Sequence, residues 1–271
     1  MMNKDKLPME RLPLKGSAST TRLPFGGAVA LIAACGLGLA IPAAARETEE
    51  GSSSSAIPSQ VETILHSMSA LLGSAKGLSL RAEIIHDDAL ESGLLIQRTA
   101  TLEVVADRPG SIQGVLSEGD ERRKLWSDGK NATLYDITNN VYTRTKVPGK
   151  IGPTLDFLAE KYGLSLPLGD IFYENPYEVL TANVGRAYYI GYAEIDDITC
   201  HQLAFTQDAI DWQLWVEAGV RPVPRRLVIV YKLLPGSPRY MATVTSLDLR
   251  SSPLPGSFTP ILRDDAEEMK T

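Results

Sequence analysis

The sequence predicts a mainly antiparallel β fold (α+β): a curved, unclosed β-barrel of about 10–11 strands, with an N-terminal amphipathic helix and a mid-chain helical insertion packed on the concave face. Three observations support this prediction. The hydrophobic period changes from 3.6 to 2 near Gly77, tight turns separate the later runs, and the helix carries an apolar stripe that must be buried. A large antiparallel sheet curls under its own twist, so its concave face is the natural place for that stripe.

The N-terminal helix is predicted to begin near position 59. Ser59 and Glu62 have the spacing of a capping box, and Gly73 and Gly77 are expected to end the helix. His66 falls on the opposite face, where we expect it to be solvated. The apolar stripe comprises Val61, Ile64, Leu65, Met68, Leu71, Leu72 and Ala75.

Two sets of short β-rich runs follow the helix. Asp128-Gly129 and Asn139-Asn140 are expected to form turns in the first set, and strands joined by tight turns are antiparallel neighbours. The first set of predicted strands covers residues 78–84, 94–106, 111–116, 123–126, 134–135 and 141–143. The second set covers residues 186–193, 199–206, 211–217, 225–234 and 240–249.

Helical spacing returns between the two sets of strands. Leu155, Leu158 and Tyr162 predict one helix, and Gly163 is expected to end it. The segment 166–180 is apolar and broken by proline, which predicts one or two short helices. These helices form the mid-chain insertion.

The chain is predicted to contain one folded domain, over residues 57–260, because no internal repeat and no Gly/Ser linker interrupts that stretch. Residues 46–56 are acidic and rich in serine, which is typical of a solvated linker. Residues 261–271 are expected to form an acidic tail.

The first 45 residues have the pattern of a secretory signal peptide. A basic lead precedes an uncharged run over 25–45, and Ala43-Ala44-Ala45 before Arg46 is a small-residue cleavage pattern. We therefore expect cleavage between Ala45 and Arg46, after which Cys200 is the only cysteine and no intrachain disulfide can form. Two alternatives stay open. The apolar run is long enough for an uncleaved membrane anchor, and Cys35 ends a segment that resembles a lipoprotein box.

The residues carry no recognisable catalytic or metal-binding motif. Cys200 and His201 are neighbours on a predicted strand, so they point to opposite faces and cannot form a nucleophile–base pair. There is no HxH, HExxH, CxxC or GxSxG pattern. The acidic clusters at 194–197 and 264–268 are expected to be solvated rather than to bind calcium. We therefore predict no enzyme activity, no cofactor and no metal, and the net charge of −6 argues against nucleic acid as a partner.

Several motifs resemble those of the predicted periplasmic family called domain of unknown function 2092, within the LolA/LolB-like lipoprotein-carrier superfamily. The resemblance covers most of residues 57–268 and implies an unclosed barrel and a periplasmic location, with a membrane-anchored lipoprotein as the alternative. The family has no established activity, so no catalytic residue is carried over. The motifs are Trp126-Ser127-Asp128-Gly129-Lys130, Tyr162-Gly163, Pro167-Leu168-Gly169-Asp170, Cys200-His201-Gln202-Leu203-Ala204-Phe205, Trp212-Gln213-Leu214-Trp215-Val216-Glu217-Ala218-Gly219 and Pro222-Val223-Pro224-Arg225.

The leading functional hypothesis is non-enzymatic binding or carriage of a lipid, acyl chain or lipoprotein in an apolar half-barrel cavity, with only transient membrane contact unless Cys35 is lipidated. The alternative is an envelope interaction or sensor protein that binds another protein and holds no ligand. Trp212 is expected to face the core with Leu214, and Trp215 the other side. The cavity candidates are Leu65, Met68, Leu72, Leu80, Ile84, Leu102, Val104, Leu158, Tyr162, Phe172, Trp212 and Leu214.

Overall fold

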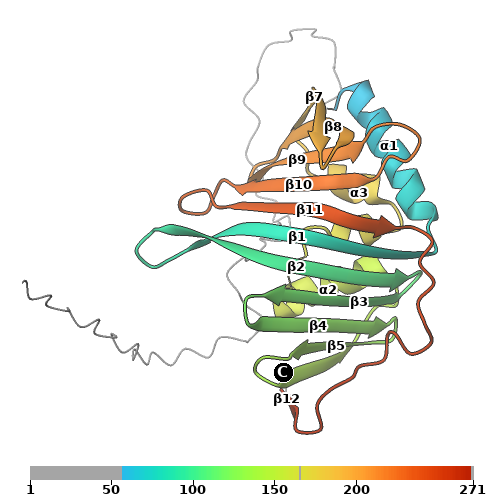
Figure 1. Ribbon diagram of the computed structural model, residues 1–271, viewed down its shortest axis with the longest axis vertical. Helices are drawn as coiled ribbons and strands as arrows, with labels where there is room; N and C mark the ends of the chain where they lie inside the picture. Colours follow the sequence, from blue (N-terminus) through green and yellow to red (C-terminus); the bar gives the residue numbers. More distant parts are fainter. Residues whose placement is uncertain (1–56, 165, 270–271) are drawn as a thin grey trace, which may run out of the picture.

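One sheet of twelve strands forms the body of the protein in the computed structural model, which describes residues 57–164 and 166–269 (Figure 1). The predicted signal peptide and linker, with Cys35, Ala45 and Arg46, lie outside the described residues. In chain order the elements are α1 (Ser59–Ser74), β1 (Gly77–Ala89), β2 (Leu95–Asp107), β3 (Ser111–Glu118), β4 (Glu121–Asp128), β5 (Asn131–Asp136), β6 (Val141–Lys146), α2 (Ile151–Tyr162), the 3₁₀ helix η1 (Gly169–Phe172), α3 (Pro176–Thr181), β7 (Arg186–Ile195), β8 (Ile198–Thr206), β9 (Ile210–Glu217), β10 (Pro224–Tyr231), β11 (Arg239–Asp248) and β12 (Glu267–Glu268).

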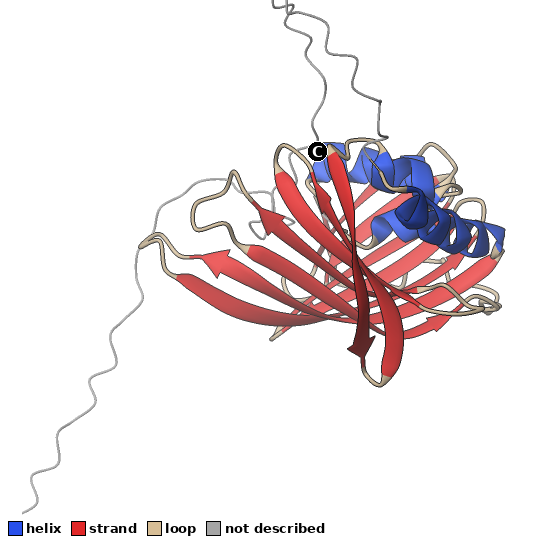
Figure 2. Cartoon of the chain, turned by 90° about the horizontal axis from the view of Figure 1, so that it is seen from above, coloured by secondary structure: helices blue, strands red, loops and turns tan. Residues whose placement is uncertain are grey.

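The sheet consists of two antiparallel meanders that share one junction. The strand order is β12-β6-β5-β4-β3-β2-β1-β11-β10-β9-β8-β7, and β1 pairs antiparallel with β11 where the meanders meet. The two edges, β12 and β7, lie at opposite ends of this order, so the barrel is unclosed, as the sequence predicts. Figure 2 shows the sheet curving around helices that lie on one side of it. No helix within the described part of the chain has the length and apolar character needed to cross a membrane.

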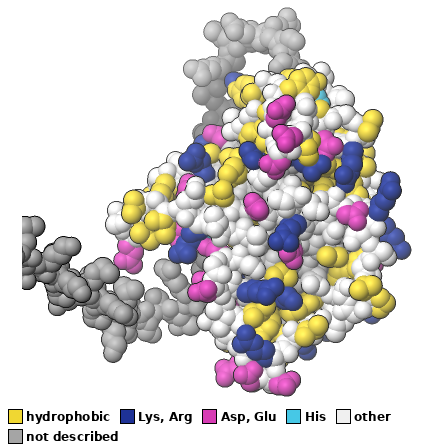
Figure 3. Space-filling view, in the orientation of Figure 1, with side chains coloured by type: hydrophobic (Ala, Val, Ile, Leu, Met, Phe, Trp, Pro, Cys, Tyr) yellow, Lys and Arg dark blue, Asp and Glu magenta, His cyan; other side chains and the backbone are white. Residues whose placement is uncertain are grey.

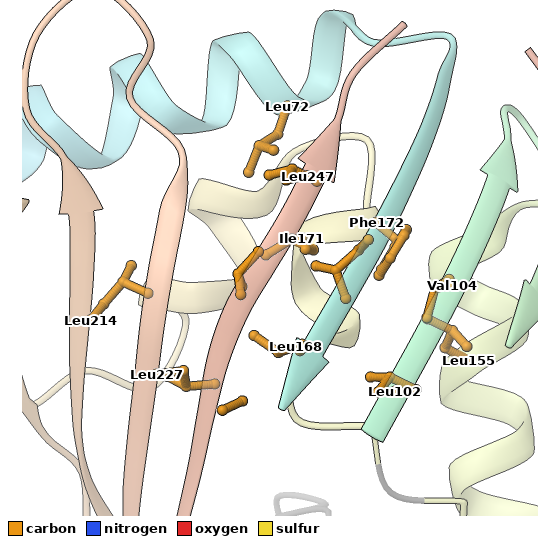
Figure 4. Packing of buried hydrophobic residues seen from close by; sticks show 14 of the residues in the cluster. Leu72, Leu102, Val104, Leu155, Leu168, Ile171, Phe172, Leu214, Leu227 and Leu247 are labelled. Atoms are coloured by element: carbon orange, nitrogen blue, oxygen red, sulfur yellow. The ribbon is translucent and has the colours of Figure 1, made fainter. Parts of the chain in front are cut away.

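The hydrophobic core lies between the concave face and the helices. Val61, Leu65, Met68 and Leu72 on α1 are fully buried, which places the predicted apolar stripe against the sheet. Figure 4 shows Leu72 beside Leu247 of β11, with side chains from the η1 segment filling the space below. Alternating residues of the strands complete this core, which is what a half-buried antiparallel sheet requires.

The start and end of α1 differ from the prediction. Pro58, not Ser59, is the N-cap residue, and no side chain caps the helix. Ser59 is already helical, so the expected capping box does not form. Gly73 lies inside α1, and a Cβ atom there would come within 2.7 Å of the Glu174 carbonyl oxygen, so this glycine permits close packing instead of ending the helix. His66 is exposed as expected, but its ring stacks on Tyr177 at 3.7 Å between centroids.

The C-terminal segment returns across the convex face to the far edge of the sheet. Phe258 and Pro260 lie beside Trp126, whose side chain is only 2% exposed on that face. The Asn140 side chain donates a hydrogen bond to the Asp265 carbonyl oxygen (3.0 Å), and β12 then pairs parallel with β6. Part of the stretch expected to form an acidic tail is therefore a strand of the sheet.

Arg108, in the turn between β2 and β3, connects the sheet to the helices. Its guanidinium group donates hydrogen bonds to the carbonyl oxygens of Leu72 (3.2 Å) and Ala75 (3.0 Å) at the end of α1. It also donates to the carbonyl oxygens of Phe172 (2.8 Å) and Tyr173 (3.2 Å) at the end of η1. One cation thus donates to four carbonyl groups at the ends of α1 and η1, and the Leu72 carbonyl also accepts the Ala75 backbone N–H at 3.2 Å.

Replacing Arg108 with methionine should therefore destabilise the fold strongly. Arg108→Met keeps an unbranched apolar stem but removes the guanidinium donors of four part-buried carbonyl groups, and we expect a loss of about 3 kcal/mol in the free energy of unfolding. Urea unfolding followed by circular dichroism measures this loss. Arg122→Met, at an exposed position of β4, is the matched control and should change stability by less than about 0.5 kcal/mol. Equal stability of the two variants would contradict the role assigned to Arg108.

Candidate functional site

A cavity of about 320 Å³ opens on the concave face. Its wall comes from β1 to β5, from Tyr240 on β11, and from the segment that follows α2. The volume lies at the lower end of the range for small-molecule sites, which is about 300–1,000 Å³. The lining residues are Ile84, His86, Asp88, Arg98, Ala100, Leu102, Val104, Ile112, Gly114, Leu116, Glu118, Glu121, Arg123, Lys124, Leu125, Leu134, Gly163, Leu164, Leu166, Pro167 and Tyr240.

The cavity has an apolar floor. Val104 on β2 pairs with Gly114 on β3, and Gly114 pairs with Leu125 on β4, so these residues form one row across the sheet. Gly114 contributes no side chain to this row. A Cβ atom added there would meet nothing closer than 4.0 Å, and the glycine backbone does not adopt a positive φ angle. The missing side chain leaves space in the middle of the floor.

Charged side chains surround the opening of the cavity. His86 Nε2 lies 3.3 Å from Glu118 Oε2, and Arg98 forms ion pairs with Asp88 (3.0 Å) and Glu118 (3.6 Å). These residues lie toward the hairpin ends of β1, β2 and β3. The concave face therefore changes from apolar to charged along the direction of the strands.

Helices fill one half of the concave face more completely than the other. The helices α1, η1 and α3 pack together over the strands of the second meander, whereas α2 and the segment after it lie over the first (Figures 1 and 2). Leu164, Leu166 and Pro167 form the side of the cavity opposite the sheet. The open volume therefore lies over β1 to β5, and Tyr240 of β11 is its lining residue from the second meander.

Three of the twelve cavity candidates named from the sequence line this cavity: Ile84, Leu102 and Val104. The other nine are buried in the packed core outside it, where side chains of α1, α2, η1 and the second meander fill the space. Trp212, for example, stacks on Phe205 with 3.9 Å between ring centroids. The nine are Leu65, Met68, Leu72, Leu80, Leu158, Tyr162, Phe172, Trp212 and Leu214.

The polar residues of the opening and the glycine of the floor were not among the residues predicted from the sequence. The alternation of residues along β1 and β3 does contain a signal for these polar residues and for this glycine. His86 and Asp88 continue the inward-facing alternation of Leu80, Ala82 and Ile84, so polar groups replace apolar ones on the same face. An isolated glycine inside a strand such as β3 often marks a place where another group approaches closely.

The structure places no nucleophile–base pair at Cys200. Cys200 is fully buried and its thiol contacts the Ile198 carbonyl oxygen, while burial raises the pKa of that thiol. His201 lies on the other face, where Nδ1 is 3.1 Å from the Tyr189 hydroxyl. Among the described residues no three His, Cys, Asp or Glu side chains are grouped so that they could hold a metal ion.

Residues 61–270 match the family model described as "Predicted periplasmic protein (DUF2092)", and the chain therefore belongs to this family. No curated protein matches it. Among solved structures, an uncharacterized conserved protein from Thermus thermophilus is 11% identical, with 78% of this chain and 98% of that chain covered and a TM-score of 0.45. A LolA superfamily protein from Nitrosomonas europaea is 14% identical, with 73% and 97% covered and a TM-score of 0.38. LprF from Mycobacterium bovis is 14% identical, with 72% and 96% covered and a TM-score of 0.45.

An acidic group of η1 follows the cavity-lining residue Pro167 along the chain. Asp170, three residues after Pro167, has its pKa raised from 3.8 to about 6, mainly because of burial and also because of the nearby Asp156 carboxylate. Asp156 accepts a hydrogen bond from the Tyr173 hydroxyl. Burial and this hydrogen bond raise the pKa of Tyr173 as well. The folded protein thus binds a proton at Asp170 more tightly than the unfolded chain does.

This raised pKa predicts a pH-dependent effect of Asp170→Asn. The stabilisation from protonated Asp170 is fully present below pH 4 and is lost as the pH rises through about 6, so at neutral pH the ionised carboxylate opposes folding. The variant should therefore be more stable than the wild type at pH 7.5, by about 1–2 kcal/mol, and the difference should shrink at pH 4. Urea unfolding at the two pH values measures this. Asp208→Asn, in an exposed loop, is the matched control, and an Asp170→Asn variant that loses stability at pH 7.5 would contradict the assignment.

Proposed function

We propose that this family member is a non-enzymatic periplasmic binding protein that holds an apolar chain, such as the acyl chain of a lipid or lipoprotein, in the concave cavity. The observation that carries the proposal is the volume of about 320 Å³ with an apolar floor and a charged opening. Burial of an acyl chain contributes about 0.8 kcal/mol for each methylene group removed from water. A row of apolar side chains is sufficient for such binding, and no catalytic group is needed.

The competing explanation is that the inward-facing side chains serve only to fold the protein. Apolar inner faces are required for folding whether or not a ligand binds. Two features favour binding. The floor contains a glycine, where a larger side chain would fit without strain, and protein interiors otherwise leave few voids larger than a water molecule. The opening is lined by charged groups that stay in contact with solvent, so the cavity has an entrance.

Filling the floor with a larger side chain should block binding. Gly114→Leu places a side chain directly in the cavity, and we expect the dissociation constant of a fluorescent fatty-acid probe to rise at least tenfold, as measured by titration into delipidated protein. Gln113→Leu is the matched control, since the neighbouring side chain on β3 points to the convex face. Its affinity should equal that of the wild type.

Two results would count against the proposal. One is equal probe affinity for Gly114→Leu and the wild type, because binding would then occur elsewhere. The other is the absence of saturable binding at micromolar probe in wild-type protein that circular dichroism shows to be folded. Either result would leave the concave cavity without a ligand.

A second candidate function is binding of another envelope protein, and one observation favours it. Leu90, Leu94 and Leu233 are 43%, 60% and 67% exposed at the tips of the β1–β2 and β10–β11 hairpins. The two hairpins project together from the sheet, and Figure 3 shows hydrophobic side chains gathered on this projection (Figures 1 and 3). Exposed apolar groups of this kind often mark contact sites. If protein binding is the function, Leu94→Ser should abolish capture of the partner while Gly114→Leu leaves it intact.

The proposal also includes export of the protein to the periplasm. We propose that residues 1–45 are removed as a signal peptide, that the mature protein begins near Arg46, and that its membrane contact is transient. The intact mass of the exported protein tests the cleavage, and we expect the mass of a chain that begins near Arg46. A mass that includes a lipid on Cys35 would instead support a membrane-anchored lipoprotein.

A further inference from the structure

We infer that the cavity holds a single acyl chain of about ten to twelve carbon atoms, and therefore that its ligand is a one-chain lipid. The inference rests on the proposed function and adds the number and the length of the chains. It depends on the volume of the cavity, on its depth along the strands, and on the packing of the rest of the concave face.

The volume of the cavity limits how much hydrocarbon it can hold. A methylene group has about the volume of one water molecule in the liquid, about 30 Å³, so a cavity of about 320 Å³ has room for about ten of them. Two chains of that length would need about twice the volume. The cavity therefore matches one chain of medium length.

The depth of the cavity along β3 gives the same length by a separate route. From the deep end to the opening, the inward-facing residues of this strand are Ile112, Gly114, Leu116 and Glu118. Ile112 is fully buried and Gly114 is not, so the accessible depth ends at Gly114. The strand advances about 13 Å from Gly114 to Glu118, and an extended chain advances about 1.2 Å for each bond, so about eleven bonds fit between them.

The polar end of the ligand lies in solvent in this arrangement. Leu116 pairs with Leu102 of β2 halfway along the chain, and Glu118 pairs with Glu121 of β4 at the opening. The Glu118 and Glu121 side chains are 24% and 59% exposed. These solvated carboxylates mark where the apolar chain should end, because hydrocarbon that extends beyond them is not removed from water.

The half of the concave face over the second meander is packed. Phe205 and Trp212 stack with 3.9 Å between ring centroids, and Leu203 and Val216 are fully buried. Leu72 of α1, which lies above this half, is also fully buried. A second chain could enter here only by displacing core side chains, which is unfavourable because protein interiors are close-packed. A second chain of the ligand would therefore stay in water.

A series of lysophosphatidylcholines tests the chain length. Lipids with one chain of 8 to 16 carbons, each kept below the concentration at which it aggregates, are used to displace a fluorescent fatty-acid probe from delipidated protein. We expect the affinity to rise about fourfold for each methylene group that becomes buried, and to level off at about ten to twelve carbons. The shared headgroup makes the contribution of the polar end equal across the series.

A pair of lipids with one headgroup tests the number of chains. The compounds 1-decanoyl lysophosphatidylcholine and 1,2-didecanoyl phosphatidylcholine carry one and two chains of ten carbons. The two-chain lipid should bind no more than about threefold more tightly, because its second chain gains no burial. Burial of both chains would instead raise its affinity by at least about a thousandfold.

Larger side chains at Gly114 should shorten the chain that is bound. Gly114→Val adds three carbon atoms at the deep end, so the affinity should level off at about eight carbons, while the 8-carbon lipid binds as it does to the wild type. Gly114→Ala adds one carbon atom and should weaken binding of the 12-carbon lipid about fourfold, and it serves as the test if Gly114→Val does not fold. Gln113→Val, on the convex face of β3, is the matched control and should leave the whole series unchanged.

The outcomes separate this inference from the proposed function. If the affinity keeps rising to 16 carbons, if the two-chain lipid binds far more tightly, or if neither Gly114 variant changes the chain-length profile, the one-chain inference is wrong while binding of an apolar chain stands. If none of the lipids binds folded wild-type protein, the proposed function fails together with the inference. A plateau at about ten to twelve carbons that shortens in Gly114→Val but not in Gln113→Val supports it.

Discussion

The pairing of β1 with β11 is the contact on which the rest of the architecture depends. It joins residues far apart in sequence, such as Leu80 and Leu247, and converts two separate meanders into one sheet. The register shifts between Arg81 and Ala82, which leaves Thr245 as an extra residue whose hydroxyl donates to the Arg81 carbonyl oxygen at 3.2 Å. Bulges of this kind bend a strand and increase its twist. The junction thus provides both the continuity and the curvature of the half-barrel.

The two halves of the curved sheet differ in how completely the helices fill the space on the concave face. The long helix α1 precedes β1, the insertion with α2, η1 and α3 lies between the meanders, and all of these helices lie on the concave side of the sheet (Figure 2). Arg108 fixes the ends of α1 and η1 to the β2–β3 turn through their carbonyl groups. Side chains of α1 and η1 then fill the space over the second meander, and the segment after α2 bridges the first without filling it. A packed core and an open cavity therefore coexist on one face.

Much of the fold could be predicted from the sequence because alternation and turn residues act locally. The predicted strands correspond to eleven strands of the sheet, and the predicted stripe of α1 is the buried face. The pairing of β1 with β11 left no local signal, and neither did the return of the chain to form β12, which has only two residues. The boundaries of β1 were underestimated because His86 and Asp88 are polar although they stay in the strand.

The site was harder to predict than the fold, and the reason is physical. Leu65 and Leu102 have the same side chain and both face inward, yet one fills the core and the other lines a void. Whether such a side chain is covered or lines a cavity depends on where the helices pack. That placement is set by tertiary contacts, which local sequence patterns do not show. Chemical identity becomes informative where it breaks the apolar pattern, as at Gly114 and Arg123. A missing side chain and an inward-facing guanidinium group are unfavourable for a core that only has to pack. Both positions line one cavity, Gly114 at its floor and Arg123 toward its opening, so these departures from the apolar pattern coincide with the half of the sheet that the helices leave open.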